Sequence, residues 1–171
     1  MVSLQELLAK IQAKAGKLPG EEEIDAYLQE FVLRKMPASE TLQEAFDVSN
    51  VDMEILYAQG YLYYDQNAFE DSTIIFQWLA ILNPFTAKYW MGLGNSSLML
   101  KDYEKALKCY AMGTVVDSDN PLPHYYAALC YQALKDPKEK QKAIDLALAK
   151  AEDFKYAALV RKIQILRECS C

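Results

Sequence analysis

The residues with the greatest chemical potential are one histidine, His124, and four cysteines, Cys109, Cys130, Cys169 and Cys171. A thiol becomes a catalytic nucleophile when an adjacent base activates it and a third group orients that base. His124 could serve Cys109 or Cys130 in this way. Both cysteines, however, fall within apolar helical patterns, in which cysteine behaves as a small hydrophobic residue. We therefore expect that the chain is not an enzyme.

Metal and cofactor chemistry is equally poorly supported. The terminal Cys169-Ser170-Cys171 could bind a metal ion or form a disulfide, but no matching group of histidines and cysteines occurs elsewhere in the sequence. A single histidine cannot complete a metal site, and no glycine-rich phosphate-binding loop is present. The sequence predicts neither a metal site nor a cofactor.

The charge distribution narrows the classes of partner. The net charge is −6, and it divides into −9 from Met1 to Leu134 and +3 from Lys135 onward. An acidic body argues against nucleic acid, which binds basic surfaces. No apolar run approaches the length of a membrane-spanning helix, and no signal peptide follows Met1. We expect a cytoplasmic protein with no stable membrane insertion.

A repeat in the middle of the chain indicates the fold. The segment Ile55–Tyr64 resembles Tyr89–Leu98, and Gly60 and Gly94 occupy the same place in the two segments. These glycines are separated by one period of the tetratricopeptide repeat (TPR), a pair of antiparallel helices that recurs about every 34 residues. The similarity continues downstream, where Phe76 aligns with Tyr110.

The aligned positions alternate between small and large residues. Small residues let the two helices of a repeat approach closely, and large residues fill the space between neighbouring repeats. The small residues are Gly60 and Gly94 in the first helices and Ser72 and Ala106 in the second helices. The large residues are Leu56, Phe76, Trp90 and Tyr110. Aromatic residues, Phe69 and Tyr103, follow the turns and are expected to anchor the second helices.

A third repeat is less regular. Tyr126–Cys130 resembles the start of a first helix, with Cys130 in the small position. Because Cys130 lies two positions beyond the place that the period assigns from Gly94, we expect two additional residues in the linker Asp117–Pro123. A second helix containing Lys142–Ala147 should follow the break at Lys135-Asp-Pro137.

The sequence thus predicts an all-α fold, a TPR superhelix of about three repeats at 53–86, 87–122 and 123–152. Residues 1–50 are expected to form N-terminal helices and a possible dimerisation region, and 153–171 a C-terminal capping helix and tail. Solenoids need such caps to cover the apolar face of an end repeat. The apolar residues that could support a homodimer are Leu7, Leu8, Ile24, Phe31 and Val32.

The first helices of stacked TPR units line a concave groove, so the groove is the candidate binding site. The predicted groove residues are Tyr57, Tyr61, Tyr64, Lys88, Met91, Asn95, Leu98, His124 and Tyr131. Tyrosine combines a large rigid face with a polar tip, methionine adapts to irregular ligands, and asparagine pairs with peptide backbone. The alternative is that some of these residues belong to the core, as we expect for Leu62 and Tyr63. A lone histidine such as His124 is often structural.

One kind of TPR ligand is disfavoured. TPR domains that capture a C-terminal carboxylate use lysine, arginine and asparagine at inner positions of their repeats. Here those positions hold Tyr57, Tyr61, Gly92, His124 and Ala128, so the required cations are missing. An uncharged inner face favours an extended apolar segment over an acidic tail.

From Leu42 to about Lys135 the sequence resembles the class II chaperones of bacterial type III secretion. The similarity rests on Tyr57–Tyr64 with Phe69 and Ile75-Phe76, and on the junction Leu82–Gly94. It continues through Asp102–Tyr110, Asp117, Asn120-Pro121 and Ala127-Ala128. The sequence departs from the family pattern in its first twenty residues and in the Lys/Asp/Pro-rich turn Lys135–Lys142.

The resemblance implies a chaperone in the bacterial cytoplasm that holds an extended segment of hydrophobic translocator proteins in the groove and keeps them soluble before export. It also implies a possible homodimer. The alternative function is a TPR scaffold that joins folded proteins within a complex.

Overall fold

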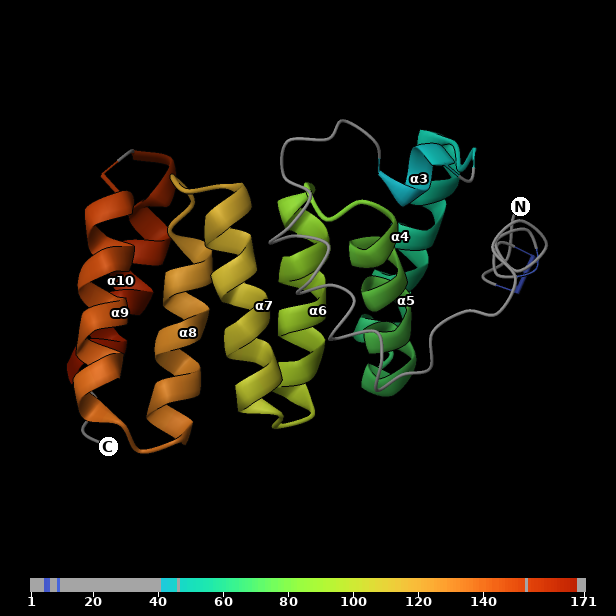
Figure 1. Cartoon of the computed structure of the whole chain (residues 1–171). Helices are drawn as coiled ribbons and strands as arrows, with labels where there is room; N and C mark the ends of the chain where they lie inside the picture. Colours follow the sequence, from blue (N-terminus) through green and yellow to red (C-terminus); the bar gives the residue numbers. More distant parts are fainter. Residues whose placement is uncertain (1–4, 7–8, 10–40, 46, 153, 169–171) are drawn as a thin grey trace. The chain divides into compact units, whose positions relative to one another are not determined.

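The computed structural model describes residues 5–6, 9, 41–45, 47–152 and 154–168 of the 171-residue chain. Within these ranges the regular structure is helical and contains no strand, which confirms the predicted all-α class (Figure 1). The predicted N-terminal helices, with Leu7, Leu8, Ile24, Phe31 and Val32, lie outside the described residues. The same is true of Cys169 and Cys171.

The chain divides into two compact units, Met1–Tyr89 and Trp90–Cys171, and each is described by itself. The first unit contains α3 (Leu42–Ala45), α4 (Asn50–Asp65), α5 (Phe69–Leu82) and the start of α6 (Ala87–Met99). The second contains the rest of α6, then α7 (Tyr103–Val116), α8 (Leu122–Ala133), α9 (Pro137–Lys150), the 3₁₀ turn η1 (Phe154–Tyr156) and α10 (Ala157–Glu168).

Side-chain caps begin four of these helices, with Thr41 as the cap of α3. The Ser49 hydroxyl accepts a hydrogen bond from the backbone N–H of Asp52 at the start of α4, at 3.1 Å. Asp102 and Asp136 cap α7 and α9 in the same way. Each cap gives one of the unpaired N–H groups of a helix N-terminus a partner. Pro137 is the first residue of α9, a position at which its missing N–H costs nothing.

The turns between the paired helices are equivalent. Asn67, Lys101 and Lys135 have positive φ angles of 61°, 63° and 58°, and each is one repeat period from the next. The following residue donates its N–H five residues back in each turn, to the carbonyls of Tyr63, Ser97 and Tyr131 respectively. Likewise α5, α7 and α9 begin at Phe69, Tyr103 and Pro137, which have the same spacing. The repeat period therefore extends through all three helix pairs.

This period corrects the prediction for the third pair. Counted from Gly94, it leads to Ala128, which is fully buried, and not to Cys130. The two additional residues predicted for the linker before α8 are accordingly not present. The predicted offset came from aligning a small apolar residue, whereas the turn at Lys135 determines the register. Lys138–Lys142, expected in a turn, lies inside α9.

Close packing at the glycines determines how near the paired helices lie. A Cβ atom on Gly60 would lie 3.0 Å from Cζ of Phe76, and one on Gly94 would lie 2.6 Å from Cε1 of Tyr110. Both rings are buried. In the first pair, the Ser72 hydroxyl also donates a 2.9 Å hydrogen bond to the carbonyl of Gly60. The predicted role of the small residues in helix approach is confirmed here.

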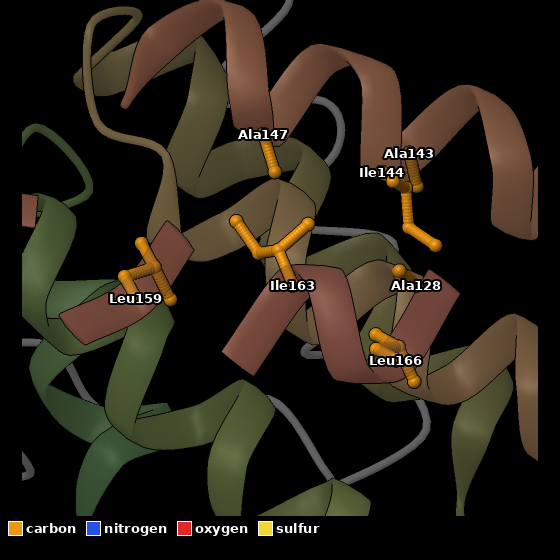
Figure 2. Packing of buried hydrophobic residues seen from close by; sticks show 7 residues of the cluster. All are labelled: Ala128, Ala143, Ile144, Ala147, Leu159, Ile163 and Leu166. Carbon is orange, nitrogen blue, oxygen red and sulfur yellow. The ribbon is translucent and has the colours of Figure 1, made fainter. Parts of the chain in front are cut away.

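The third pair is closed by aliphatic residues and covered by α10. A cluster of seven buried residues joins α8, α9 and α10 (Figure 2). Its members are Ala128, Ala143, Ile144, Ala147, Leu159, Ile163 and Leu166. Because α10 contributes three of them, it covers apolar surface of α8 and α9 that would otherwise face water, as expected for a capping helix.

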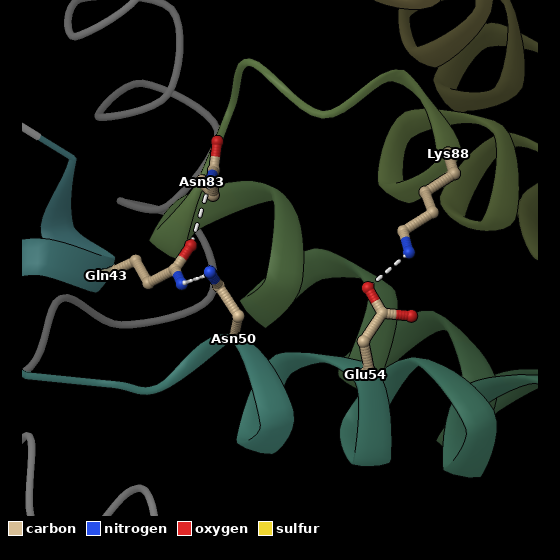
Figure 3. Close-up of polar contacts among 5 residues, drawn as sticks. All are labelled: Gln43, Asn50, Glu54, Asn83 and Lys88. Carbon is tan, nitrogen blue, oxygen red and sulfur yellow. Dashed lines mark hydrogen bonds and ion pairs between the residues drawn. The ribbon is translucent and has the colours of Figure 1, made fainter.

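A buried polar network ties α3 to the first helix pair (Figure 3). The Gln43 side chain, only 7% exposed, donates to Oδ1 of Asn50 at 2.7 Å and to the carbonyl of Val48 at 3.2 Å. Its Oε1 accepts from Nδ2 of Asn83 at 2.9 Å. Burial of an amide is tolerated when its donors and acceptors are paired. Gln43 thus joins α3, the start of α4 and the residue after α5.

Replacing Gly94 by alanine should destabilise the protein. Its new methyl group would overlap the ring of Tyr110, whose hydroxyl is held by Asn95 at 3.0 Å. We expect a loss of about 1–3 kcal/mol, typical of overpacking. The control is Gly113→Ala, whose Cβ would have its nearest neighbour at 3.5 Å. That variant should gain up to about 1 kcal/mol from helix propensity. Urea unfolding followed by circular dichroism measures both; equal stability of the two variants would contradict the packing argument.

Candidate functional site

Three predicted groove tyrosines lie together on α4. Tyr57, Tyr61 and Tyr64 follow one another at intervals of four and three residues, which places them on one helical face. Their ring centroids are separated by 4.9 Å (Tyr57–Tyr61) and 6.4 Å (Tyr61–Tyr64), with edge-to-face geometry. All three side chains are partly exposed. They form a continuous aromatic surface that remains in contact with solvent.

Residues beyond the predicted set support this surface from below. The buried ring of Phe76 lies 5.9 Å from Tyr57 and 5.3 Å from Tyr61. Phe69 lies 5.4 Å from Tyr64, and Tyr89 lies 5.9 Å from Tyr57. We call these six residues, Tyr57, Tyr61, Tyr64, Phe69, Phe76 and Tyr89, the α4 aromatic cluster. Edge-to-face aromatic pairs add stability beyond their buried area, so the exposed tyrosines are held in fixed positions.

Lys88 supplies the positive charge beside this cluster. Its Nζ lies 4.4 Å from the ring centroid of Tyr57 and 5.6 Å from that of Tyr89, as in cation–π contacts. The same ammonium pairs with the carboxylate of Glu54 on α4 (Figure 3). Glu54 and Lys88 are both partly exposed, so the pair contributes little to stability. It does fix the position of Lys88 over the tyrosine rings.

Three tyrosines of the cluster, Tyr57, Tyr64 and Tyr89, remain uncharged at neutral pH. Burial raises the pKa of Tyr57, and its hydrogen bond with Tyr61 raises it further. Burial and the nearby carboxylate of Glu54 raise the pKa of Tyr89 to about 12. Burial also raises the pKa of Tyr64. The surface therefore offers apolar faces with neutral hydroxyl groups, which suits a ligand that is itself largely apolar.

The predicted groove residues on α6 differ in how far their side chains are exposed and in what they contact. Met91 is only 9% exposed and belongs to a buried cluster with Ala106, Tyr110 and Cys130, so the core alternative describes it better. Leu98 is partly buried against that cluster. The carbonyl oxygen of Asn95 accepts a hydrogen bond from the Tyr110 hydroxyl, which fixes its amide group.

His124 and Tyr131 were predicted to line the groove, but the structure places both of them in a pocket. Both line a pocket of about 250 Å³ between α7, α8 and α9. The repeat period assigns the α8 positions equivalent to Tyr57, Tyr61 and Tyr64 to other residues, namely Tyr125, Leu129 and Gln132. Sequence reasoning missed these because it shifted the third repeat by two positions. The Lys-Asp pair that precedes the second helix in the second and third turns, at 101–102 and 135–136, was the signal that could have corrected it.

Two core assignments also need comment. Leu62 was expected in the core but is 55% exposed, because helix geometry places it about 160° around α4 from Gly60, which lies against α5. Tyr63 is partly buried. Conversely, the four residues predicted to fill space between helices are at most 4% exposed. They are Leu56, Phe76, Trp90 and Tyr110.

The groups with potential for covalent chemistry are poorly placed for it. Cys109 and Cys130 are buried free thiols, and burial raises the pKa of Cys130 to about 12. Reactive thiols have lowered pKa values and are accessible. Within the described part of the chain, no three histidine, cysteine or acidic side chains gather as a metal site would require. No helix there is long and apolar enough to cross a membrane.

Helix pairs of constant period, with aromatic residues on the first helix, define a protein of the tetratricopeptide-repeat class. No protein-family model matches the chain. It aligns with a chain of the CopN–Scc3 complex at 34% identity and a TM-score of 0.86, covering 96% of this chain and 98% of that one.

Two further relatives support a common family for this chain. PcrH, solved in complex with the chaperone-binding region of PopD, is 31% identical with a TM-score of 0.69, over 71% of this chain and 92% of that one. The low calcium response locus protein H of Yersinia pestis is 26% identical over 112 residues, 64% of this chain and 67% of that protein. The chain belongs to the class II translocator chaperones of type III secretion.

The stability of the folded chain should depend on the protonation of His124. Burial, and secondly the charge of Lys150, lower the pKa of His124 from its ordinary value of 6.5. Below that pH the unfolded chain binds more protons than the folded one, so stability falls as pH falls. We expect the free energy of unfolding of the wild type to decrease relative to His124→Gln between pH 7.5 and pH 5.

Urea titrations of both proteins across this range provide the measurement. Carboxylates titrate alike in the two proteins, so the difference between them isolates the histidine. A difference that stays constant with pH would show that His124 has the same pKa in the folded and unfolded chains.

Proposed function

We propose that this chain is a cytoplasmic chaperone that binds an extended segment of hydrophobic type III secretion translocators and keeps them soluble before export. The observation that carries the proposal is the partly exposed α4 aromatic cluster with its uncharged tyrosines. PcrH, 31% identical to this chain, is known in complexes with the chaperone-binding regions of PopD and of PopB. The chemistry of the cluster suits such a segment.

The surface matches an extended apolar peptide in two respects. Rigid aromatic faces bury the ligand's aliphatic side chains with little loss of conformational entropy. The hydroxyl groups of Tyr57, Tyr61 and Tyr64 and the ammonium of Lys88 can form hydrogen bonds with the backbone of an extended peptide. The N–H and C=O groups of that backbone need such partners because they are not paired in a sheet. Because Phe76 and Phe69 hold the rings beneath, the surface exists before the ligand arrives.

Further contacts are proposed on the second unit. Asn95 and Leu98 on α6 keep their predicted role, with the Asn95 amide nitrogen as donor because its oxygen already accepts from Tyr110. Tyr125, Leu129 and Gln132 on α8 replace His124 and Tyr131 as the expected ligand contacts. This exchange follows from the repeat register, since Tyr125, Leu129 and Gln132 hold the same places in α8 as Tyr57, Tyr61 and Tyr64 hold in α4.

The proposed mode of action is binding without catalysis. Its support is membership of a chaperone family and the burial of Cys109 and Cys130. The proposed location is the bacterial cytoplasm, where a translocator must be held before export. A homodimer through residues 1–50 stays a prediction. The predicted limits of the N-terminal region, the repeats and the C-terminal tail also stay predictions.

Replacing Tyr64 by alanine should weaken translocator binding. Truncating an aromatic anchor in a binding surface costs about 2 kcal/mol or more, which corresponds to roughly a thirtyfold loss of affinity. The control is Leu62→Ala, which removes an exposed apolar side chain from another face of the same helix. Both variants should keep wild-type circular dichroism. Titration against a translocator from the same organism measures the affinities. Equal affinities for the two variants would exclude the α4 surface as the translocator-binding site.

Co-expression separates the chaperone from a scaffold. A translocator that is insoluble alone should become soluble when produced with this chain, because the chaperone covers apolar segments that otherwise aggregate. A scaffold would bind folded partners and leave their solubility unchanged. The measurement is the soluble fraction of the translocator, with and without the chain and with Tyr64→Ala. No gain in solubility would favour the scaffold alternative.

A further inference from the structure

Glu54, Tyr57 and Lys88 show how a cation is bound on the exposed face of α4. The Lys88 ammonium pairs with the Glu54 carboxylate and lies 4.4 Å from the ring centroid of Tyr57. The carboxylate attracts the ammonium by its charge, and the ring attracts it through the negative potential of its face. Glu54 precedes Tyr57 by three residues, so the two groups are neighbours on the helix surface. The first unit thus contains one lysine held by a carboxylate and a tyrosine ring.

The other end of α4 presents the same two kinds of group. Asp65 is the last residue of α4, is exposed and follows Tyr61 by one helical turn. Helix geometry places Glu54 and Asp65 within roughly 40° of Tyr61 around the helix axis. Burial and the neighbouring Tyr61 raise the pKa of the Tyr64 hydroxyl, and the nearby Asp65 carboxylate raises it further. Asp65 therefore lies beside the Tyr64 end of the α4 aromatic cluster.

The chain supplies few cations to this region. Lys88 is the single lysine or arginine between residues 36 and 100, a segment that contains eight acidic residues. Lys88 is already paired with Glu54. Among the residues that the structure describes, no lysine or arginine pairs with Asp65. A cation that binds Asp65 is therefore expected to come from the ligand.

The position of Asp65 is electrostatically unfavourable in the free chain. The carbonyl groups at the C-terminal end of a helix carry partial negative charge, which disfavours a carboxylate and favours a cation. The last turn of α4 contains no basic residue. Departures from such local rules are expected at functional sites, where a ligand supplies the compensation. A cation bound at Asp65 would relieve repulsion that α4 itself leaves uncompensated.

We infer that Asp65, with the rings of Tyr61 and Tyr64, forms a specificity-determining site that receives a lysine or arginine side chain of the bound translocator segment. The inference rests on the proposed function, because it adds a charged contact to the same α4 surface. With Lys88 at the Tyr57 end and Asp65 at the Tyr64 end, the surface is electrically asymmetric. A segment with one basic residue beside its apolar anchors therefore binds in one direction only.

The first test compares two conservative variants of the full chain. Asp65→Asn should weaken binding of a translocator from the same organism about threefold to tenfold, as for an exposed charge pair that also contacts an aromatic ring. It should also reduce the salt dependence of binding. The control is Asp71→Asn, which changes an exposed aspartate on α5 and should bind like the wild type. Equal affinities of the two variants at low salt would overturn the inference.

The stability of the free chain separates a ligand contact from a structural role. Asp65→Asn removes a negative charge from the C-terminal end of α4, so the urea midpoint of the free chain should stay the same or rise. Weaker binding together with an unchanged or raised midpoint identifies Asp65 as a ligand contact. Weaker binding with a lowered midpoint would show that Asp65 supports the fold, and it would overturn the inference.

A charge exchange identifies the partner group. Asp65→Lys should weaken binding about tenfold or more, because like charges then meet in the complex. Changing the matching lysine or arginine of the translocator segment to glutamate should restore part of the lost affinity, whereas the same change at other basic positions should not. If none of these changes restores binding, the inference is wrong.

The two proposals fail in different ways. If no translocator binds the wild-type chain, the proposed function is wrong, and this inference is wrong with it. If a translocator binds and Tyr64→Ala weakens the binding, but Asp65→Asn and Asp65→Lys leave it unchanged, the proposed function stands. That result would refute the cation site at Asp65 alone.

Discussion

The contact between a glycine backbone and an aromatic ring sets the distance between the helices of the first two repeats, and the surfaces depend on it. Phe76 fills the space over Gly60 and also lies beneath Tyr57 and Tyr61. Tyr110 fills the space over Gly94, donates to Asn95 and lines the α7–α9 pocket. The rings that close the helix pairs therefore also position the residues available to ligands.

The third pair meets the same constraint with other residues. Its equivalents of Gly94 and Tyr110 are Ala128 and Ile144, both nearly fully buried in one cluster. A larger residue on the first helix is matched by a smaller one on the second, so the combined volume changes little. Cores tolerate such exchanges when volume is conserved. This compensation explains why the third repeat looked irregular in sequence although its turn is equivalent to the others.

The sequence was sufficient to predict the helices where small and apolar residues recur with a regular period. The spacing of Gly60 and Gly94 predicted the first two helix pairs, and the need to cover the last repeat predicted a capping helix; the structure contains both. Burial within a helix was harder to predict. Leu62 and Met91 were assigned to the wrong side because both faces of these helices carry apolar residues, and only the packing of neighbouring helices distinguishes them. The shift at Cys130 arose because small size alone does not define register.

The three matching turns have a consequence for how such a chain can change in length. Because Asn67, Lys101 and Lys135 share one backbone conformation and one spacing, the segment between any two of them is a complete module. Copying or removing such a segment would rejoin equivalent backbone and leave every helix in phase. An insertion of any other length within one of these helices would rotate the following side chains off their faces. Growth by whole helix pairs is therefore a change in the helical part of the chain that this architecture accommodates without repacking its core.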